Sequence, residues 1–284
     1  MIEQCRRQYP LKLMCHALEL SRSGYYAQRK RPASMRTIQN RRLQAAISAS
    51  YQASHQTYGS PRIHADLRDQ GFSCSLNRVA HLMQVNGIRA VTRPRRRAPA
   101  SDSQRESPVA PNRLNRSFAV GEPNRIWLGD ITDIETGEGT LYLSAILDLG
   151  SRLIVGWSMD GRRDQKLVYR ALDMALGRRR PPEALLHHTD QGSQYGATNY
   201  QMLMERHRIV ASMSRRGNPR DNAPMESWIR TLKVELINRM DLTIWREVKE
   251  AIAEWIELFY NTRRRHSALG YLSPAEYERK YNLA

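Results

Sequence analysis

The chain has 284 residues and a formal net charge of +17, from 45 Lys and Arg against 28 Asp and Glu. This length predicts two or three compact units with one sizeable core. The apolar runs are far too short for a membrane span, and the N-terminus lacks the apolar core of a signal peptide. The 3 cysteines form no CxxC pair and no regular framework, which argues against a secreted disulfide scaffold and against a zinc site. We therefore expect a cytoplasmic protein.

The basic excess lies in the N-terminal part of the chain. Residues 1–120 hold 21 Lys and Arg against 6 Asp and Glu, whereas residues 121–284 hold 24 against 22. So uneven a distribution predicts an N-terminal module that binds a polyphosphate such as nucleic acid. The alternative is a basic surface that serves only solubility, but solubility does not require this asymmetry.

The first fifty residues predict helices. Apolar residues over 11–18 predict a short helix, and residues 21–26 predict a turn followed by a second short helix. Ser34 can then cap a longer helix. The apolar positions of that longer helix include Ile38, Ala45 and Ile47.

Residues 53–91 predict a sharper pair of helices. Ser60 is the expected cap of the first helix, with Pro61 at its first position, and Ser75 is the expected cap of the second. Two short helices joined by a tight turn are typical of a helix-turn-helix, which would place Asn77 and Arg78 where base edges are read. A generic helical hairpin has the same pattern and remains the alternative.

A linker is expected after this pair. Residues 92–117 contain four prolines with Ser and Arg and almost no large apolar side chain, so they cannot bury a core. The basic cluster at its start can track a DNA backbone. This cluster comprises Arg93, Arg95, Arg96 and Arg97.

From Ile126 onward the pattern changes to strands and helices. Three strands joined by Gly-containing turns come first, and helices and strands then alternate. The expected strands are 126–134, 141–149, 152–159, 184–188 and 209–213, and the expected helices are 166–178, 199–206, 225–238 and 245–261.

Three carboxylates in this part of the chain are candidate ligands of catalytic metal ions. Asp130 lies within an expected strand, and Asp190 directly follows another expected strand. Glu226 lies at the start of an expected helix, and 35 residues separate it from Asp190. Oxygen ligands of this kind suit Mg²⁺ or Mn²⁺ rather than zinc. Two such ions can clamp the attacking and leaving oxygens of a phosphodiester displacement.

Each carboxylate also has an ordinary explanation. Asp130 can cap a turn at a strand end, and Asp133 competes with it for either role. Asp190 can form an Asx-turn, and Glu226 is favoured in the first turn of a helix by the helix dipole. Taken one at a time, these residues are better explained by structure than by metal binding.

Ordered motifs over almost the whole length settle the choice. The chain closely resembles the second-reading-frame product of DDE transposases of the IS-three (insertion sequence three) type. The motifs that carry the resemblance are His187–Tyr195, Asp221–Trp228, Tyr142–Leu143, Asp148–Arg152, Val155–Trp157, Ser212–Asn218, Thr231–Glu235, Tyr260–Asn261, Arg264, His266, Leu269 and Ser273–Pro274.

The resemblance implies an α/β fold. We expect a ribonuclease-H-like integrase core, with a mixed five-stranded sheet and flanking helices, preceded by an all-α helix-turn-helix region. The resemblance selects Asp130 over Asp133 and implies that Asp130, Asp190 and Glu226 bind two Mg²⁺ or Mn²⁺ ions. The expected domains are a basic helical region over 1–52, the helix-turn-helix over 53–91, the linker over 92–121 and the catalytic core over 122–284.

Several further residues are expected near the site. Lys233 lies two helical turns after Glu226 on nearly the same face, where we expect a DNA contact, whereas for Arg230 a DNA contact and a surface ion pair are equally weighted. His188 and Asn222 are candidates for orienting the ligands, although His188 can equally be a packed strand residue and Asn222 a helix cap. We expect Asp148 to serve turn structure.

The resemblance implies DNA 3′-end cleavage and strand transfer during transposition of an insertion sequence. The expected partners are double-stranded DNA at element ends and target, further copies of the chain in a homo-oligomer, and an upstream-reading-frame protein or fusion, all at the bacterial nucleoid. One alternative is a catalytically silent DNA-binding regulator of transposition. Another is a hydrolytic nuclease of the ribonuclease-H kind, which only its products would distinguish from a strand transferase.

Overall fold

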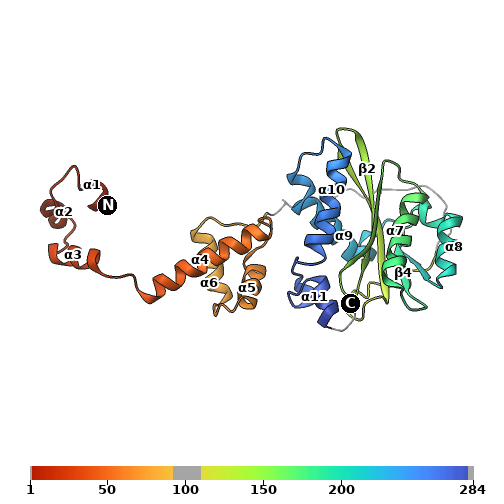
Figure 1. Cartoon of the computed structure of the whole chain (residues 1–284), viewed down its shortest axis with the longest axis horizontal. Helices are drawn as coiled ribbons and strands as arrows, with labels where there is room; N and C mark the ends of the chain where they lie inside the picture. The colour runs from red at the N-terminus through yellow and green to blue at the C-terminus, as the bar shows by residue number, and fades with distance from the viewer. Residues whose placement is uncertain (1, 92–109, 281–284) are drawn as a thin grey trace.

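A computed structural model describes residues 2–91 and 110–280 of the chain (Figure 1). Small helices come first, followed by a three-helix unit and then a larger α/β core. The predicted basic cluster at Arg93 and Arg95–Arg97 lies outside the described residues. Among the helices of the described residues, none is long and apolar enough to cross a membrane.

The longest N-terminal helix begins at its predicted cap, Ser34, and Ser21 caps the shorter helix before it. Ser21 Oγ accepts from Gly24 N at 2.9 Å and Ser34 Oγ from Thr37 N at 3.2 Å. Of the apolar positions expected on the longer helix, Ile47 is buried, whereas Ile38 and Ala45 are exposed and Leu43 is buried instead. The helices are α1 (Ile2–Cys5), α2 (Leu11–Ala17), α3 (Arg22–Lys30) and α4 (Met35–Ala53).

The predicted helical pair is present as α5 (Ser60–Asp69) and α6 (Leu76–Val85), and both helices pack on α4. Ser75 caps α6 as predicted, accepting from Arg78 N at 3.3 Å. The cap predicted at Ser60 is off by one residue, because Gly59 is the N-cap of α5 and Ser60 is its first helical residue.

The core is built on one mixed five-stranded sheet with the order β3-β2-β1-β4-β5. The first three strands pair antiparallel, while β4 and β5 run parallel to β1. Each predicted strand is present with shifted ends. The bounds are β1 (Ile126–Thr136), β2 (Gly139–Asp148), β3 (Ile154–Asp160), β4 (Leu186–Thr189) and β5 (Val210–Met213).

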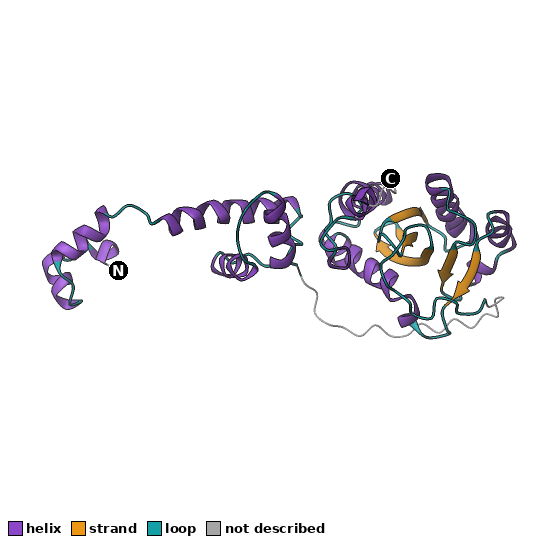
Figure 2. Ribbon diagram, turned by 90° about the horizontal axis from the view of Figure 1, so that it is seen from below, coloured by secondary structure: helices purple, strands orange, loops and turns teal. Residues whose placement is uncertain are grey.

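Helices cover both faces of the sheet (Figures 1 and 2). Because strand residues alternate between faces, Leu128 and Ile134 of β1 pack with Trp228 on one face, while Trp127 and Ile131 pack on the other. The first face is covered by α9 (Ala223–Glu235) and α10 (Trp245–Glu254), and the second by α7 (Gln165–Arg179) and α8 (Thr198–Arg206).

The C-terminal helices differ in detail from the prediction. The helix expected over 225–238 begins two residues earlier and ends at Glu235, where a short 3₁₀ turn (Ile237–Arg239) follows. The helix expected to reach residue 261 changes from α to π geometry at Trp255–Tyr260. A last helix, α11 (Pro274–Lys280), was not expected.

The three-helix unit docks on the core beside α9 and α10 (Figure 1). Tyr58 Oη donates to Arg263 O at 3.1 Å and accepts from Arg265 N at 2.8 Å. The guanidinium of Arg265 pairs with Asp66 and, at 2.6 Å, with Asp69, both on α5. These contacts hold the predicted DNA-reading unit on the same side of the sheet as α9.

Candidate active site

Asp130 lies on β1 and faces the α9 side of the sheet. It shares that face with Leu128 and Ile134, which belong to the same core cluster as Trp228 of α9. Asp133, its rival in the sequence, is three residues further on, hence on the opposite face, and is exposed. Because side chains alternate between the two faces of the sheet, Asp130, and not Asp133, faces the helix that carries Glu226.

Asp190 and Glu226 approach Asp130 from two other elements. Asp190 directly follows β4, which runs parallel to β1 with His188 in register with Leu128. Its Oδ1 accepts from Gly192 N at 3.0 Å. Glu226 is exposed in the first turn of α9, whereas Asp130 and Asp190 are half-buried.

The negative charges of Asp190 and Glu226 act on Asp130. Burial, followed by the negative charges of Asp190 and Glu226, raises the pKa of Asp130 to about 8, against the opposing effect of a 2.8 Å hydrogen bond from Ile131 N. Burial also raises the pKa of Asp190 and of Glu226. Like charges held this close repel, and a bound cation would relieve that repulsion.

The donor set fits a hard divalent cation, although it is not gathered into a ligand shell. Over residues 2–91 and 110–280, no three His, Cys, Asp or Glu side chains are close enough together to hold a metal ion. Two of the carboxylates accept hydrogen bonds from nearby backbone N–H groups instead, at Ile131 and Gly192. The three carboxylates supply oxygen donors of the kind that Mg²⁺ and Mn²⁺ prefer.

His188 and Asn222 lie beside the carboxylates but bond elsewhere. His188 is buried, and its ring nitrogens bond Ser212 Oγ at 2.8 Å and Ser214 Oγ at 3.0 Å. Burial lowers the pKa of His188 to about 4, so the ring is neutral. Asn222 Nδ2 donates to Gly129 O at 3.2 Å, one residue before Asp130.

Lys233 and Arg230 project from the same helix as Glu226. Lys233 is half-buried and Arg230 is exposed. Within the described part of the chain neither makes a hydrogen bond or an ion pair with another side chain, so Arg230 does not form the surface ion pair that was its alternative. Both cations are free to meet an external anion.

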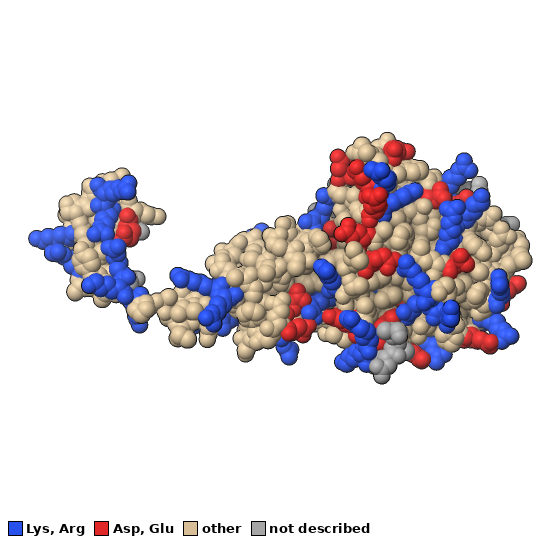
Figure 3. Space-filling view, in the orientation of Figure 1, with Lys and Arg blue, Asp and Glu red and all other residues tan. Residues whose placement is uncertain are grey.

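The two residues predicted to contact bases differ in whether their side chains already have a hydrogen-bond partner among the residues that the structure describes. Asn77 is exposed near the start of α6. Arg78 is half-buried, and its guanidinium donates twice to Asn40 Oδ1 of α4, at 3.0 and 2.7 Å. Arg78 would have to leave Asn40 before it could contact a base. Figure 3 shows Lys and Arg gathered on the N-terminal helices and both signs of charge interspersed on the core.

Comparison with known proteins decides the family. The HTH-like domain family matches residues 39–97, and integrase core domain families match residues 121–219 and 207–274. Transposase InsF for insertion sequence IS3A of Escherichia coli (strain K12) is 40% identical over 286 residues, covering 100% of this chain and 98% of the relative. The chain belongs to the IS3 family of transposases.

A second relative agrees with this assignment. The insertion element IS600 uncharacterized 31 kDa protein of Shigella sonnei is 40% identical to the transposase, covering 95% of this chain and 98% of the relative. The integrase core matches and the mixed five-stranded sheet confirm the predicted ribonuclease-H-like core and the helical region before it. The transposase is a polynucleotidyl transferase of the DDE class.

Solved structures give only weak likenesses. A simian T-cell lymphotropic virus intasome in complex with PP2A regulatory subunit B56 gamma aligns at 14% identity, 81% coverage of this chain and 73% of that one, with a TM-score of 0.44. The HTLV-2 integrase catalytic core domain in complex with magnesium (dimeric form) aligns at 18% identity, 54% and 95% coverage, and a TM-score of 0.39. Scores this low carry no argument about mechanism.

Three residues near the site were missed in the sequence. The hydroxyl of Tyr195 is buried without a hydrogen-bond partner in the described structure, and burial, then the charges of Asp190 and Asp130, raise its pKa well above the usual value. Arg163, in the loop before α7, lowers the pKa of both aspartates by its charge. Asp221, the first residue of the Asp221–Trp228 motif, is completely buried. Tyr195 and Asp221 lie in motifs of the resemblance, whereas nothing in the sequence singled out Arg163.

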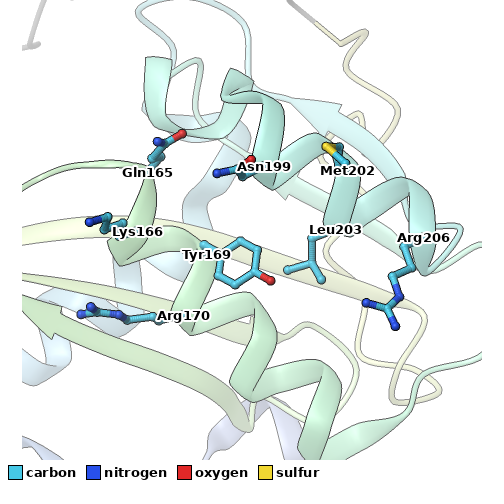
Figure 4. Close-up of a pocket in the computed structure, with 8 residues that line it drawn as sticks. All are labelled: Gln165, Lys166, Tyr169, Arg170, Asn199, Met202, Leu203 and Arg206. Carbon is cyan, nitrogen blue, oxygen red and sulfur yellow. The ribbon is translucent and has the colours of Figure 1, made fainter.

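A cavity of the transposase is lined by residues of α7 and α8 (Figure 4). It has a volume of about 560 Å³ between α7 and α8, and Tyr169, Met202 and Leu203 form part of its lining with Lys166 and Arg206. None of the three carboxylates lines it. The catalytic candidates therefore lie outside this cavity.

Proposed function

We propose that Asp130, Asp190 and Glu226 hold divalent cations, two Mg²⁺ or Mn²⁺ ions per active site, and that this site cleaves DNA at the 3′ ends of the element and joins them to target DNA. The observation that carries the proposal is the approach of three carboxylates from β1, the end of β4 and α9, close enough that two of them raise the pKa of the third. When bound, the ions supply charge stabilisation and activation of the attacking oxygen.

The protein's own groups would position the DNA. Asp130 and Asp190 are fixed by the sheet and by backbone hydrogen bonds, whereas Glu226 and Arg230 are exposed on α9. Lys233 lies on nearly the same face of α9 as Glu226, so we assign it to a phosphate of the strand beside the reacting bond. Positioning of this kind supplies much of the rate enhancement in phosphodiester exchange, where the bonds broken and formed are alike.

Recognition of the element ends is assigned to the N-terminal half. Asn77 is available for base contacts, and the N-terminal helices concentrate the basic charge. We also propose contributions from Arg95, Arg96 and Arg97 to the DNA backbone, and from Arg78 once released from Asn40. Action as a homo-oligomer at the nucleoid, together with an upstream-reading-frame protein or as a fusion with it, belongs to the same proposal, as do domain boundaries at 52, 91 and 121.

The test is a product analysis with a labelled element-end duplex and a supercoiled target plasmid in Mg²⁺. We expect labelled strands joined covalently to the plasmid and no joined product from the Asp190→Asn protein. Cleaved but never joined ends would indicate a hydrolytic nuclease. Binding without any cleavage, equal for the unmutated and Asp190→Asn proteins, would indicate a silent regulator.

A further inference from the structure

Asp221 is a fourth carboxylate close to the active site, and it is completely buried. It lies in a short 3₁₀ turn (Pro219–Asn222) that leads directly into α9, five residues before Glu226. Its two oxygens accept five hydrogen bonds. The donors are Asn112 Nδ2 at 3.1 Å, Arg116 Nε at 2.7 Å, Arg215 N at 3.0 Å, Arg215 Nε at 2.8 Å and Arg215 Nη2 at 2.8 Å.

These donors come from two distant parts of the chain. Arg215 lies two residues after the end of β5, whereas Asn112 and Arg116 belong to residues 112–116, which we call the strap. The strap is held along its length, because Arg113 N and Leu114 N donate to Ser212 Oγ at 2.9 and 3.4 Å. It thus crosses the end of β5 and stays beside β4, whose end carries Asp190.

The strap is part of the core and not a free tether. Leu114 is only 2% exposed and packs in the same cluster as Leu128 and Trp228. Ser212, which accepts from the strap, also bonds His188 of β4. The strap is therefore connected to the strands of both site aspartates as well as to Asp221.

On its other side, the 3₁₀ turn contacts the strand of Asp130. Asn222 Nδ2 donates to Gly129 O at 3.2 Å, and Asn222 Oδ1 is buried with no hydrogen-bond partner in the described structure. The corner formed by Asp221 and Asn222 thus joins the strap, the end of β5 and β1 at the point where α9 begins. The orientation of Glu226 relative to Asp130 depends on this corner.

The corner is held by charge as well as by geometry. Hydrogen bonds between ions are roughly twice as strong as neutral ones. The bonds from Arg215 and Arg116 hold the pKa of Asp221 far below its usual value, so the carboxylate stays ionised. A buried carboxylate that lost these partners would draw water or neighbouring donors toward itself and would move the start of α9.

We propose that Asp221 is a positioning residue. Its hydrogen bonds from Arg116 and Arg215 fix the first turn of α9 so that Glu226 faces Asp130 and Asp190. The strap thereby ties the segment that enters the core to the catalytic centre. This inference rests on the proposed function of Glu226 as a site carboxylate. Partners that orient ligands in this way are commonly worth about 10–100-fold in metal affinity or activity.

The test uses Arg116→Ala in the full chain, because Asp221→Asn risks the fold itself. Arg116 is 42% exposed at its side chain, so its loss removes one bond to Asp221 without opening the core. We expect Mn²⁺ affinity, measured by calorimetry, and the cleavage rate each to fall roughly tenfold. DNA affinity should change by less than about twofold, with Arg116→Lys recovering part of the loss because it keeps the charge.

Arg125→Ala is the matched control, since it removes an exposed arginine that pairs with Glu122 on the surface. We expect it to change neither Mn²⁺ affinity nor rate. If Arg116→Ala lost activity only in proportion to its unfolded fraction, with unchanged Mn²⁺ affinity, Asp221 would be a purely structural anchor and the proposal would be overturned. Unchanged affinity and rate would overturn it equally.

Failure of the proposed function is separable from failure of this inference. If Glu226→Gln cleaved DNA at the unmutated rate, the role of Glu226 itself would be wrong, whatever Arg116→Ala did. If Glu226→Gln were inactive while Arg116→Ala behaved like the unmutated protein, only the positioning role of Asp221 would be rejected.

Discussion

Asp130→Asn should stabilise the metal-free transposase at alkaline pH. The pKa of Asp130 is raised from 3.8 to about 8 in the folded protein, so the folded state binds a proton more tightly than the unfolded state does. The stability that this group contributes is present in full below about pH 4 and is lost progressively as the pH rises to about 8. Asparagine has no carboxylate to ionise, so the variant escapes this loss.

The magnitude follows from the difference in pKa. A pKa difference of about four, at about 1.4 kcal/mol for each pKa unit, sets an upper limit of roughly 6 kcal/mol on this contribution to the free energy of unfolding. Asp130 is half-buried and faces a site that water can enter, so the full limit does not apply. We expect Asp130→Asn to be more stable than the unmutated protein by about 2 kcal/mol at about pH 9 and by little near pH 5. Divalent cations should stabilise the unmutated protein and leave the variant unaffected.

The assay is urea unfolding in the presence of a chelator at several pH values. Asp133→Asn is the control, because Asp133 is an exposed carboxylate on the opposite face of the same strand, and it should show no pH-dependent difference. If Asp130→Asn were no more stable than the unmutated protein at about pH 9, the electrostatic description of the site would be refuted.

Three further outcomes are expected. Removing residues 1–91 should weaken DNA binding and flatten its dependence on salt, because residues 1–120 hold most of the excess positive charge; equal slopes of affinity against salt would contradict this. Lys233→Ala should slow strand transfer without changing Mn²⁺ affinity, with part of the loss recovered at low salt, whereas an unmutated joining rate would make Lys233 an ordinary surface cation. Gly156→Ala should cost about 1–3 kcal/mol in chemical denaturation, because its Cβ would lie 2.2 Å from Ala171 O, while Gly177→Ala, with open space around it, should be neutral or slightly stabilising.

Local patterns in the sequence predict most of the elements. Ser34 and Ser75 cap helices as expected, because capping depends on residues only three positions apart. The ends of the helices are less predictable. Gly59 caps α5 in place of Ser60, and the change to π geometry at Trp255–Tyr260 has no local signal that we can identify.

The site needed information that local sequence does not contain. The choice between Asp130 and Asp133 depends on which face of β1 meets α9, which strand pairing decides. Arg78 begins a helix as a base-reading residue would, yet its partner Asn40 is 38 positions away. Asp221 looks like a helix-start residue, but two of its five hydrogen bonds come from the strap, more than 100 positions away in the sequence.

The most direct test of the account is calorimetric titration of Mn²⁺ into the transposase bound to an element-end duplex. The unmutated protein is predicted to bind two ions, and Asp130→Asn, Asp190→Asn and Glu226→Gln are each predicted to lose binding while still holding DNA. Asp133→Asn should bind Mn²⁺ as the unmutated protein does. Any one of the three site variants that bound two ions with unchanged affinity would contradict the claim that these carboxylates form a single metal site.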